Sequence, residues 1–196
     1  RNGGQRFFTR YRITTMKMHP LLNDPGESYI FQWQTLNEKT FKSLSAEFKT
    51  DFKLLSDLDD QQRLAWMSSV VLDKEGEGRD EFFEYTWSRL GDLLTSIHVI
   101  TELFVENMKL FSAEGVRYME IQRRVDDYKN ERGEIIPAEQ SDAYWKWRLA
   151  QKDARETGVA VRWQAVALRF DSDAEQQIRD YYKHIDSNRD VWVGIN

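Results

Sequence analysis

The stretch Gly115-Val-Arg-Tyr-Met-Glu-Ile-Gln122 decides how the rest of the chain is interpreted. It is rich in residues that favour strands, and it follows a segment, 93–114, whose apolar residues have helical spacing. Gly115 stands where a helix ends, because glycine reaches a positive φ at little cost. The stretch therefore predicts a helix that stops at Gly115 and an inner strand of a parallel sheet over 116–122.

The same arrangement returns twice further along the chain. A helical segment that opens at Pro137 ends at Gly158, and a strand is predicted over 159–169. Another helical segment leads to a last predicted strand over 191–195. Strand, helix, strand, helix, strand is the order of a parallel α/β fold. We expect three neighbouring parallel strands in chain order, with positive φ at Gly115 and Gly158.

Composition excludes several classes of protein. The 196 residues suffice for one domain or slightly more, and their net charge of −5 with scattered basic residues argues against a nucleic-acid partner. No apolar run approaches the length of a membrane span, and no signal peptide is visible, so no membrane partner is expected. Cysteine is absent, which excludes disulfides and thiolate metal sites but leaves the compartment and the oligomeric state undecided.

The chain is divided into two parts by these patterns. Apolar spacing predicts helices over 40–51 and 59–71, whereas 1–18 alternates and is compatible with a strand or an arm. Residues 19–26 hold two prolines and a Pro-Gly pair, which predicts a loop. We therefore treat 1–92 as a mostly helical segment and 93–196 as a strand–helix repeat. Because a bare third parallel strand is rare, we expect the chain to be part of a larger protein. The alternative is a three-stranded domain that is complete as it stands.

Polar residues inside the predicted strands indicate what the sheet surrounds. Period-two alternation places Glu120 and Gln122 on one face, and Arg162 and Gln164 on one face of the next strand. Charged residues inside successive parallel strands suit a barrel interior, where Glu120 and Arg162 are a candidate ion pair. The alternative is that one of the two lies at a strand end in water.

Residues at the carboxyl ends of the strands face the active site in a (β/α)8 barrel. Here these residues are Gln122, Arg123, Arg169, Asp171 and Asn196, each of which could instead have a capping or loop role. For Asp171 the favoured interpretation is a helix cap. The three histidines, His19, His98 and His184, show no metal-binding spacing, so we interpret them as packed or surface residues.

Four segments, in their order and spacing, resemble the adenosine deaminase family, nearest to the adenosine deaminase-related growth factors and their bacterial relatives. They are Asp80-Glu-Phe-Phe-Glu-Tyr-Thr-Trp87, Glu114-Gly-Val-Arg-Tyr-Met-Glu-Ile121, Gly158 to Arg169, and Val191-Trp-Val-Gly-Ile-Asn196. The resemblance covers residues 80–196 well and residues 1–79 in general layout only.

The resemblance implies a partial TIM (β/α)8 barrel, one catalytic zinc and hydrolytic deamination of a purine nucleoside such as adenosine. In such enzymes zinc lowers the pKa of a bound water and makes it a nucleophile. The zinc ligands and the acid–base residues of the family follow the first barrel strand and the later strands, and this chain has none of those positions. The expectation is an N-terminal half fragment that lacks the first strand and stops at the fourth, with zinc only in the full-length protein.

The resemblance also suggests substrate-binding residues. Residues 1–92 would form an excursion over the barrel mouth, whose aromatic side chains wall a nucleoside pocket; the alternative is that they pack on the barrel. Relatives often carry arginine at Gln122 and aspartate at Asn196. The full set of candidates is Phe82, Phe83, Trp87, Gln122, Arg169 and Asn196.

Two other interpretations stay open at this point, since a fold does not determine a function. One is a non-catalytic binding or growth-factor-like member of the same fold, and the other is an unrelated α/β interaction domain. On the favoured interpretation, the partners are a purine nucleoside and the remainder of the barrel. The 196-residue chain alone is expected to bind no catalytic zinc and to deaminate nothing.

Overall fold

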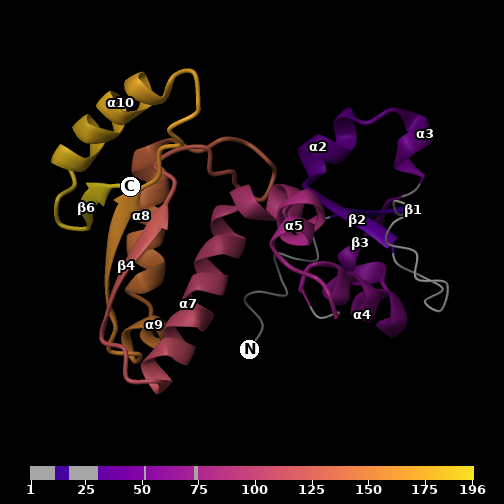
Figure 1. Ribbon diagram of the computed structural model, residues 1–196, viewed down its shortest axis with the longest axis horizontal. Coiled ribbons are helices and arrows are strands. Elements are labelled where there is room, and N and C mark those ends of the chain that lie inside the picture. Colours follow the sequence, from indigo (N-terminus) through magenta and orange to yellow (C-terminus); the bar gives the residue numbers. More distant parts are fainter. Residues whose placement is uncertain (1–11, 18–30, 51, 73–74) are drawn as a thin grey trace. The chain divides into compact units, whose positions relative to one another are not determined.

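The computed structural model describes residues 12–17, 31–50, 52–72 and 75–196. The chain forms two compact units (Figure 1). The first comprises Arg1–Ile100 with Lys129–Glu134, and the second comprises Thr101–Tyr128 with Ile135–Asn196. None of the helices in the described ranges is long and apolar enough to cross a membrane. Each unit is described by itself below.

The first unit contains a three-stranded antiparallel sheet in the order β2-β1-β3. Its strands are β1 (Arg12–Lys17), β2 (Phe31–Leu36) and β3 (Phe52–Leu54). Arg12 pairs with Leu36 on one side and with Leu54 on the other. The segment 1–92 was predicted as mostly helical, and that prediction did not include this sheet. The predicted loop over 19–26 and His19 lie outside the described residues.

The helices of the first unit are short. They are α2 (Glu38–Ser43), α3 (Ala46–Lys49), η2 (Leu55–Asp57), α4 (Asp60–Ser69), α5 (Arg79–Glu81), the π-helix η3 (Phe82–Thr86), α6 (Trp87–Leu90) and η4 (Gly91–Thr95). Asp59 caps α4 through a reciprocal hydrogen-bond pair with Gln62, at the start of the helix that was predicted over 59–71. The single helix predicted over 40–51 is divided, because Leu44 and Ser45 are extended and Ser45 begins a new helix.

The second unit carries the parallel sheet. Its elements are most of α7 (Ile97–Ala113), then β4 (Tyr118–Arg123), α8 (Ala138–Leu149), α9 (Lys152–Arg155), β5 (Ala160–Ala165), α10 (Ala174–Asp186) and β6 (Trp192–Ile195). The strands are parallel and neighbouring in the order β4-β5-β6, which confirms the predicted topology. Gly115 and Gly158 have φ of 93° and 65°, also as predicted. The described chain is thus mixed α/β with a small parallel sheet.

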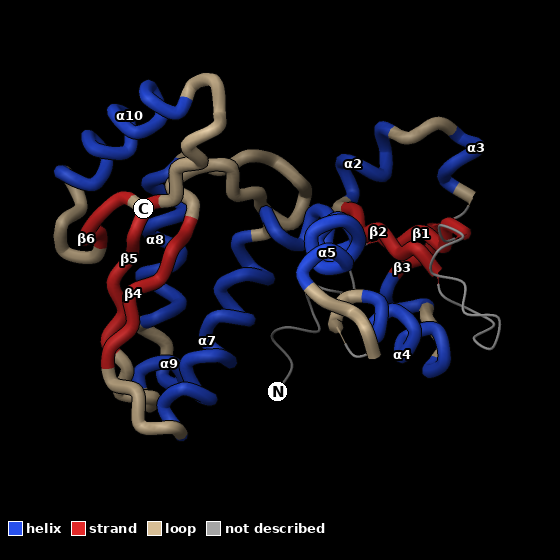
Figure 2. The backbone as a smooth tube through the Cα atoms, in the orientation of Figure 1, coloured by secondary structure: helices blue, strands red, loops and turns tan. Residues whose placement is uncertain are grey.

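The two faces of this sheet differ. In Figure 2, α7, α8 and α9 lie on one side of the strands. On that side Met119 and Val161 pack against a core of Val105, Met108 and Ala154 from the helices. The other face presents polar residues, and Tyr118 is 53% exposed there. Parallel sheets are usually covered on both faces, so the polar face is the unusual feature of this unit.

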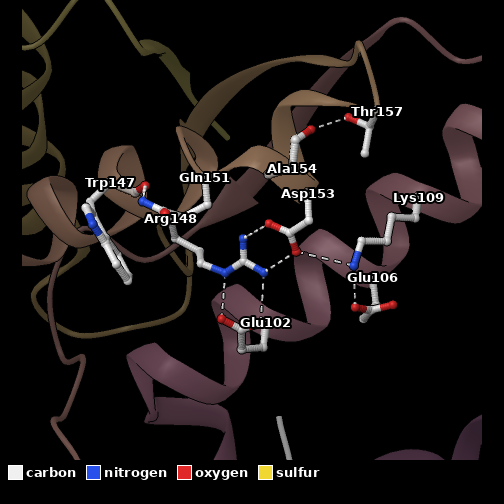
Figure 3. Close-up of polar contacts among 9 residues, drawn as sticks. All are labelled: Glu102, Glu106, Lys109, Trp147, Arg148, Gln151, Asp153, Ala154 and Thr157. Atoms are coloured by element: carbon white, nitrogen blue, oxygen red, sulfur yellow. Dashed lines mark hydrogen bonds and ion pairs between the residues drawn. The ribbon is translucent and has the colours of Figure 1, made fainter. Parts of the chain in front are cut away.

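A network of charged residues joins α7 to α8 and α9 (Figure 3). Arg148 donates to both carboxylate oxygens of Glu102, at 2.6 and 2.9 Å, and to both of Asp153, at 3.0 and 2.9 Å. Lys109 connects Asp153 to Glu106. Because guanidinium and carboxylate match in a bidentate geometry, this network sets the distance between the helices.

The same network predicts a response to acid. Hydrogen bonding from Arg148 lowers the pKa of Asp153 from 3.8 to about 2. A lowered pKa means that ionised Asp153 stabilises the folded unit above about pH 4, and that this contribution is lost as the pH falls from about 4 to about 2. Since Asp153 is 46% exposed, we expect a contribution below about 1 kcal/mol.

Urea unfolding at pH 5, 4, 3 and 2 tests this expectation. The Asp153→Asn variant should lose less stability than the unaltered chain over the acid range. Asp127→Asn, which removes only an exposed partner of Arg124, serves as the control and should follow the unaltered chain. Parallel pH curves for all three proteins would contradict the assignment.

Candidate functional site

The carboxyl edge of the parallel sheet is the candidate site. The three strands end at Arg123, Ala165 and Ile195, and because they are parallel these ends share one edge. Open α/β sheets and barrels both bind ligands at this edge. Gln122 is the penultimate residue of β4, and Asn196 follows β6 directly.

The loop after β5 brings a third predicted residue to this edge. The backbone N–H of Asn196 donates to the carbonyl of Ala165 at 2.8 Å, and the N–H of Ala167 donates to the carbonyl of Asn196 at 3.1 Å. These bonds join the start of the loop to the end of β6. Arg169 lies two residues beyond Ala167, so Gln122, Arg169 and Asn196 all belong to the carboxyl edge.

The side chains of Gln122, Arg169 and Asn196 are exposed. Within the described part of the chain they make no hydrogen bond or ion pair, whereas most charged residues of the sheet are engaged. Polar side chains that remain free at a ligand-binding edge are available to a ligand. An amide can both donate and accept, so Gln122 and Asn196 suit a heterocycle or a sugar hydroxyl.

A hydrogen-bonded row leads along the polar face to this edge. The hydroxyl of Tyr118 donates to Glu120 at 2.7 Å, and Gln164 on β5 donates to the other oxygen of Glu120 at 2.6 Å. Hydrogen bonding from Tyr118 lowers the pKa of Glu120, and hydrogen bonding to Glu120 raises the pKa of Tyr118.

The candidate ion pair between Glu120 and Arg162 does not form. The two residues are direct neighbours in the parallel register, as the alternation predicted. However, Glu120 accepts from Tyr118 and Gln164, while the guanidinium of Arg162 donates to the carbonyl of Val161 at 2.8 Å. The face is exposed, so neither charge requires the other, and neutral donors satisfy the carboxylate instead.

Arg123 lies under the edge on the opposite face of β4, within a group of aromatic rings. Its guanidinium carbon is 4.1 Å from the ring centre of Trp163 and 4.4 Å from that of Trp192. Trp145 and Tyr128 are next, at 5.3 and 5.8 Å. Burial lowers the pKa of Arg123, and contact with Tyr128 and Asp142 opposes this shift. The aromatic faces and one carboxylate therefore stabilise the buried guanidinium in place of water.

That carboxylate is Asp142 on α8, and it accepts from three elements. Arg123 of β4 donates to one of its oxygens, while Trp192 of β6 and His184 of α10 reach the other at 2.8 Å each. The side chains of Arg123 and Asp142 are 2% and 4% exposed. Asp142 is thus the joint between the sheet and two of its helices, directly beneath the carboxyl edge.

This cluster was not predicted. His184, interpreted from the sequence as a packed or surface histidine, is packed, with a side chain that is 10% exposed. Asp142 lies three residues before the buried Trp145 on α8, so both are on one face of that helix. An acidic residue on a buried helix face needs a cation beside it. The position of Asp142 on the face of Trp145 was therefore the sequence feature from which a buried ion pair could have been predicted. The partners themselves lie 19 and 42 residues away in sequence.

The aromatic candidates Phe82, Phe83 and Trp87 belong to the first unit and gather around the π-helix η3. The ring of Phe82 is 5.1 Å from that of Phe83 and 5.8 Å from that of Trp87. Phe83 and Trp87 are 61% and 49% exposed. Single π-helical turns occur often at functional sites. The role of these rings as the wall of a pocket stays a prediction.

A recess lies at the opposite, amino-terminal end of β5. It has a volume of about 430 Å³, and its lining is apolar apart from one arginine, Arg155. Met108, Leu149 and Val161 form most of its apolar wall. It lacks the convergent polar groups that orient a substrate, so the carboxyl edge is the better candidate.

The described residues do not fit a zinc site. Within these ranges no group of three or more histidine, cysteine, aspartate or glutamate side chains converges to hold a metal ion. His184 is committed to Asp142 at 2.8 Å. A catalytic zinc needs about three protein ligands, which these residues do not supply.

Comparison of the chain with protein-family models, with curated proteins and with solved structures found no match in any of the three.

Proposed function

We propose that the parallel unit is the early part of a (β/α)8 barrel and that the full-length protein is a zinc-dependent hydrolase of the adenosine deaminase kind. The observation that carries this proposal is the polar face of the β4-β5-β6 sheet. A hydrogen-bonded row of Tyr118, Glu120 and Gln164 covers it, and free polar side chains stand at its carboxyl edge. A barrel interior is the environment in which parallel strands carry polar residues toward a site.

In the proposed reaction, water replaces the amino group of a purine nucleoside such as adenosine, and ammonia leaves. Zinc in the full-length protein would activate the water, with ligands outside the residues described above. This chain would contribute binding through the amides of Gln122 and Asn196, which would hydrogen-bond the substrate. Arg123 and Asp142 position the edge without touching the substrate.

The second candidate is a non-catalytic binding protein on the same fold. Two features support it: the described residues do not converge on a metal, and Gln122 and Asn196 are uncharged where relatives often carry arginine and aspartate. An unrelated α/β interaction domain is the third candidate. In both alternatives the free carboxyl edge is a binding surface, but the protein does not catalyse deamination.

Metal analysis and an ammonia-release assay with adenosine separate these candidates. The full-length protein should hold one zinc per chain and release ammonia, whereas the 196-residue chain should do neither. In the full-length protein, Asn196→Ala should raise KM, and the exposed Gln140→Ala on α8 should leave KM unchanged. A full-length protein without metal or turnover would favour the non-catalytic candidate, and stoichiometric zinc in the 196-residue chain would contradict the assignment of ligands.

A further inference from the structure

The loop between β5 and α10 presents three unusual side chains in a row. Leu168 and Phe170 are 43% and 77% exposed, and the exposed Arg169 lies between them. A turn holds the three together, because the backbone N–H of Asp171 donates to the carbonyl of Leu168 at 3.0 Å. Binding residues lie disproportionately on loops, and contiguous exposed apolar side chains mark interaction sites.

Arg169 has no partner among the described residues, unlike the arginines within β4 and β5 and those that directly flank β4. The others are engaged: Arg117 and Arg162 donate to backbone carbonyls, Arg123 pairs with Asp142, and Arg124 pairs with Asp127. In this acidic chain, with a net charge of −5, an unpaired guanidinium at a ligand-binding edge is available to bind an anionic ligand. It offers a planar fork of donors that fits a phosphate or carboxylate.

The loop that carries Arg169 starts at the candidate site. The N–H of Ala167 donates to the carbonyl of Asn196, so the start of the loop is held against the end of β6. Arg169 and Phe170 follow within three residues of that bond. A flat ring and an anion-binding group therefore stand together at the edge where Gln122 and Asn196 are free.

We propose that Arg169 and Phe170 form a recognition pair for a nucleoside monophosphate, with the guanidinium on the phosphate and the phenyl ring against the base or sugar. The inference rests on the proposed function, and it narrows the substrate of that site from a nucleoside to a purine nucleotide. Asp171 and Asp173 follow in the same loop, so the loop as a whole is not basic. The preference therefore comes from one guanidinium, which corresponds to about ten-fold in affinity.

Equilibrium dialysis of the full-length protein with adenosine and with adenosine 5′-monophosphate tests the proposal, alongside ammonia release from each. We expect the monophosphate to bind about ten-fold more tightly, and the ratio to fall to about one in Arg169→Gln. Arg155→Gln is the matched control, because Arg155 is also exposed and unpaired among the described residues but lies before β5, at the other end of the strand. Phe170→Leu should weaken both ligands equally.

Each outcome bears on a different claim. Equal binding of the two ligands, or a ratio that Arg169→Gln leaves unchanged, overturns the recognition pair and leaves the proposed deaminase intact. Tight binding of the monophosphate without ammonia release supports the pair and overturns the proposed reaction. Binding of neither ligand overturns both.

Discussion

Replacing Asp142 with alanine is expected to destabilise the parallel unit by about 3–5 kcal/mol, because it leaves the buried guanidinium of Arg123 without a counter-charge. That is a large part of the stability of an ordinary domain. The same change removes the acceptor of Trp192 and His184, so β6 and α10 lose a common anchor on α8.

Urea unfolding followed by tryptophan fluorescence measures the effect, since Trp145, Trp163 and Trp192 all lie in this cluster. The control is Asp190→Ala, which removes an exposed ion pair with Lys146 and should cost less than about 1 kcal/mol. Trp192→Phe, which removes one hydrogen bond, should cost about 1 kcal/mol.

A rescue experiment distinguishes an unpaired charge from a simple loss of packing. Combining Arg123→Met with Asp142→Ala removes the buried cation, and we expect it to recover much of the stability that the single Asp142 variant loses. A double variant no more stable than Asp142→Ala would show that the charge is not the cause.

Replacing Gly91 with alanine is the second change with a large expected effect. Gly91 has φ of 48° and ψ of −126°, a backbone conformation that residues with a Cβ rarely adopt. A Cβ at this position would lie 2.4 Å from the carbonyl oxygen of Thr35, a buried residue of β2. Strain and the clash with a backbone atom should together cost at least about 3 kcal/mol.

Gly76 provides the matched control for this variant. Its φ is 86°, but a Cβ there would meet nothing within 4 Å. Gly76→Ala therefore reports the cost of a positive φ alone, about 1 kcal/mol. Thermal unfolding of both variants compares the two glycines, and an equal fall in Tm would contradict the close approach of Gly91 to β2.

The elements that could be predicted from the sequence are those with local signals. Gly115 and Gly158 mark helix ends by their conformational freedom, and the residues after each of them favour strands. Apolar spacing predicted α4 and α10, and Pro137 predicted the start of α8, because each of these signals is contained within one element. The sheet of the first unit was not predicted as such, since β3 is only three residues long and too short to show alternation.

The sequence by itself therefore determined the order and direction of the parallel strands. Gln122 and Asn196 could be chosen because position along a strand decides which end a residue occupies. The strand predicted over 159–169 was too long, because β5 ends at Ala165 and Arg169 lies in the loop that follows. Only the tertiary structure decided the partners of the buried charges. Arg123, Asp142 and His184 come from a strand and two helices that are distant in sequence. A buried charge is stabilised by an opposite charge that the packing of distant segments brings next to it. No local sequence pattern identifies which residue supplies that opposite charge.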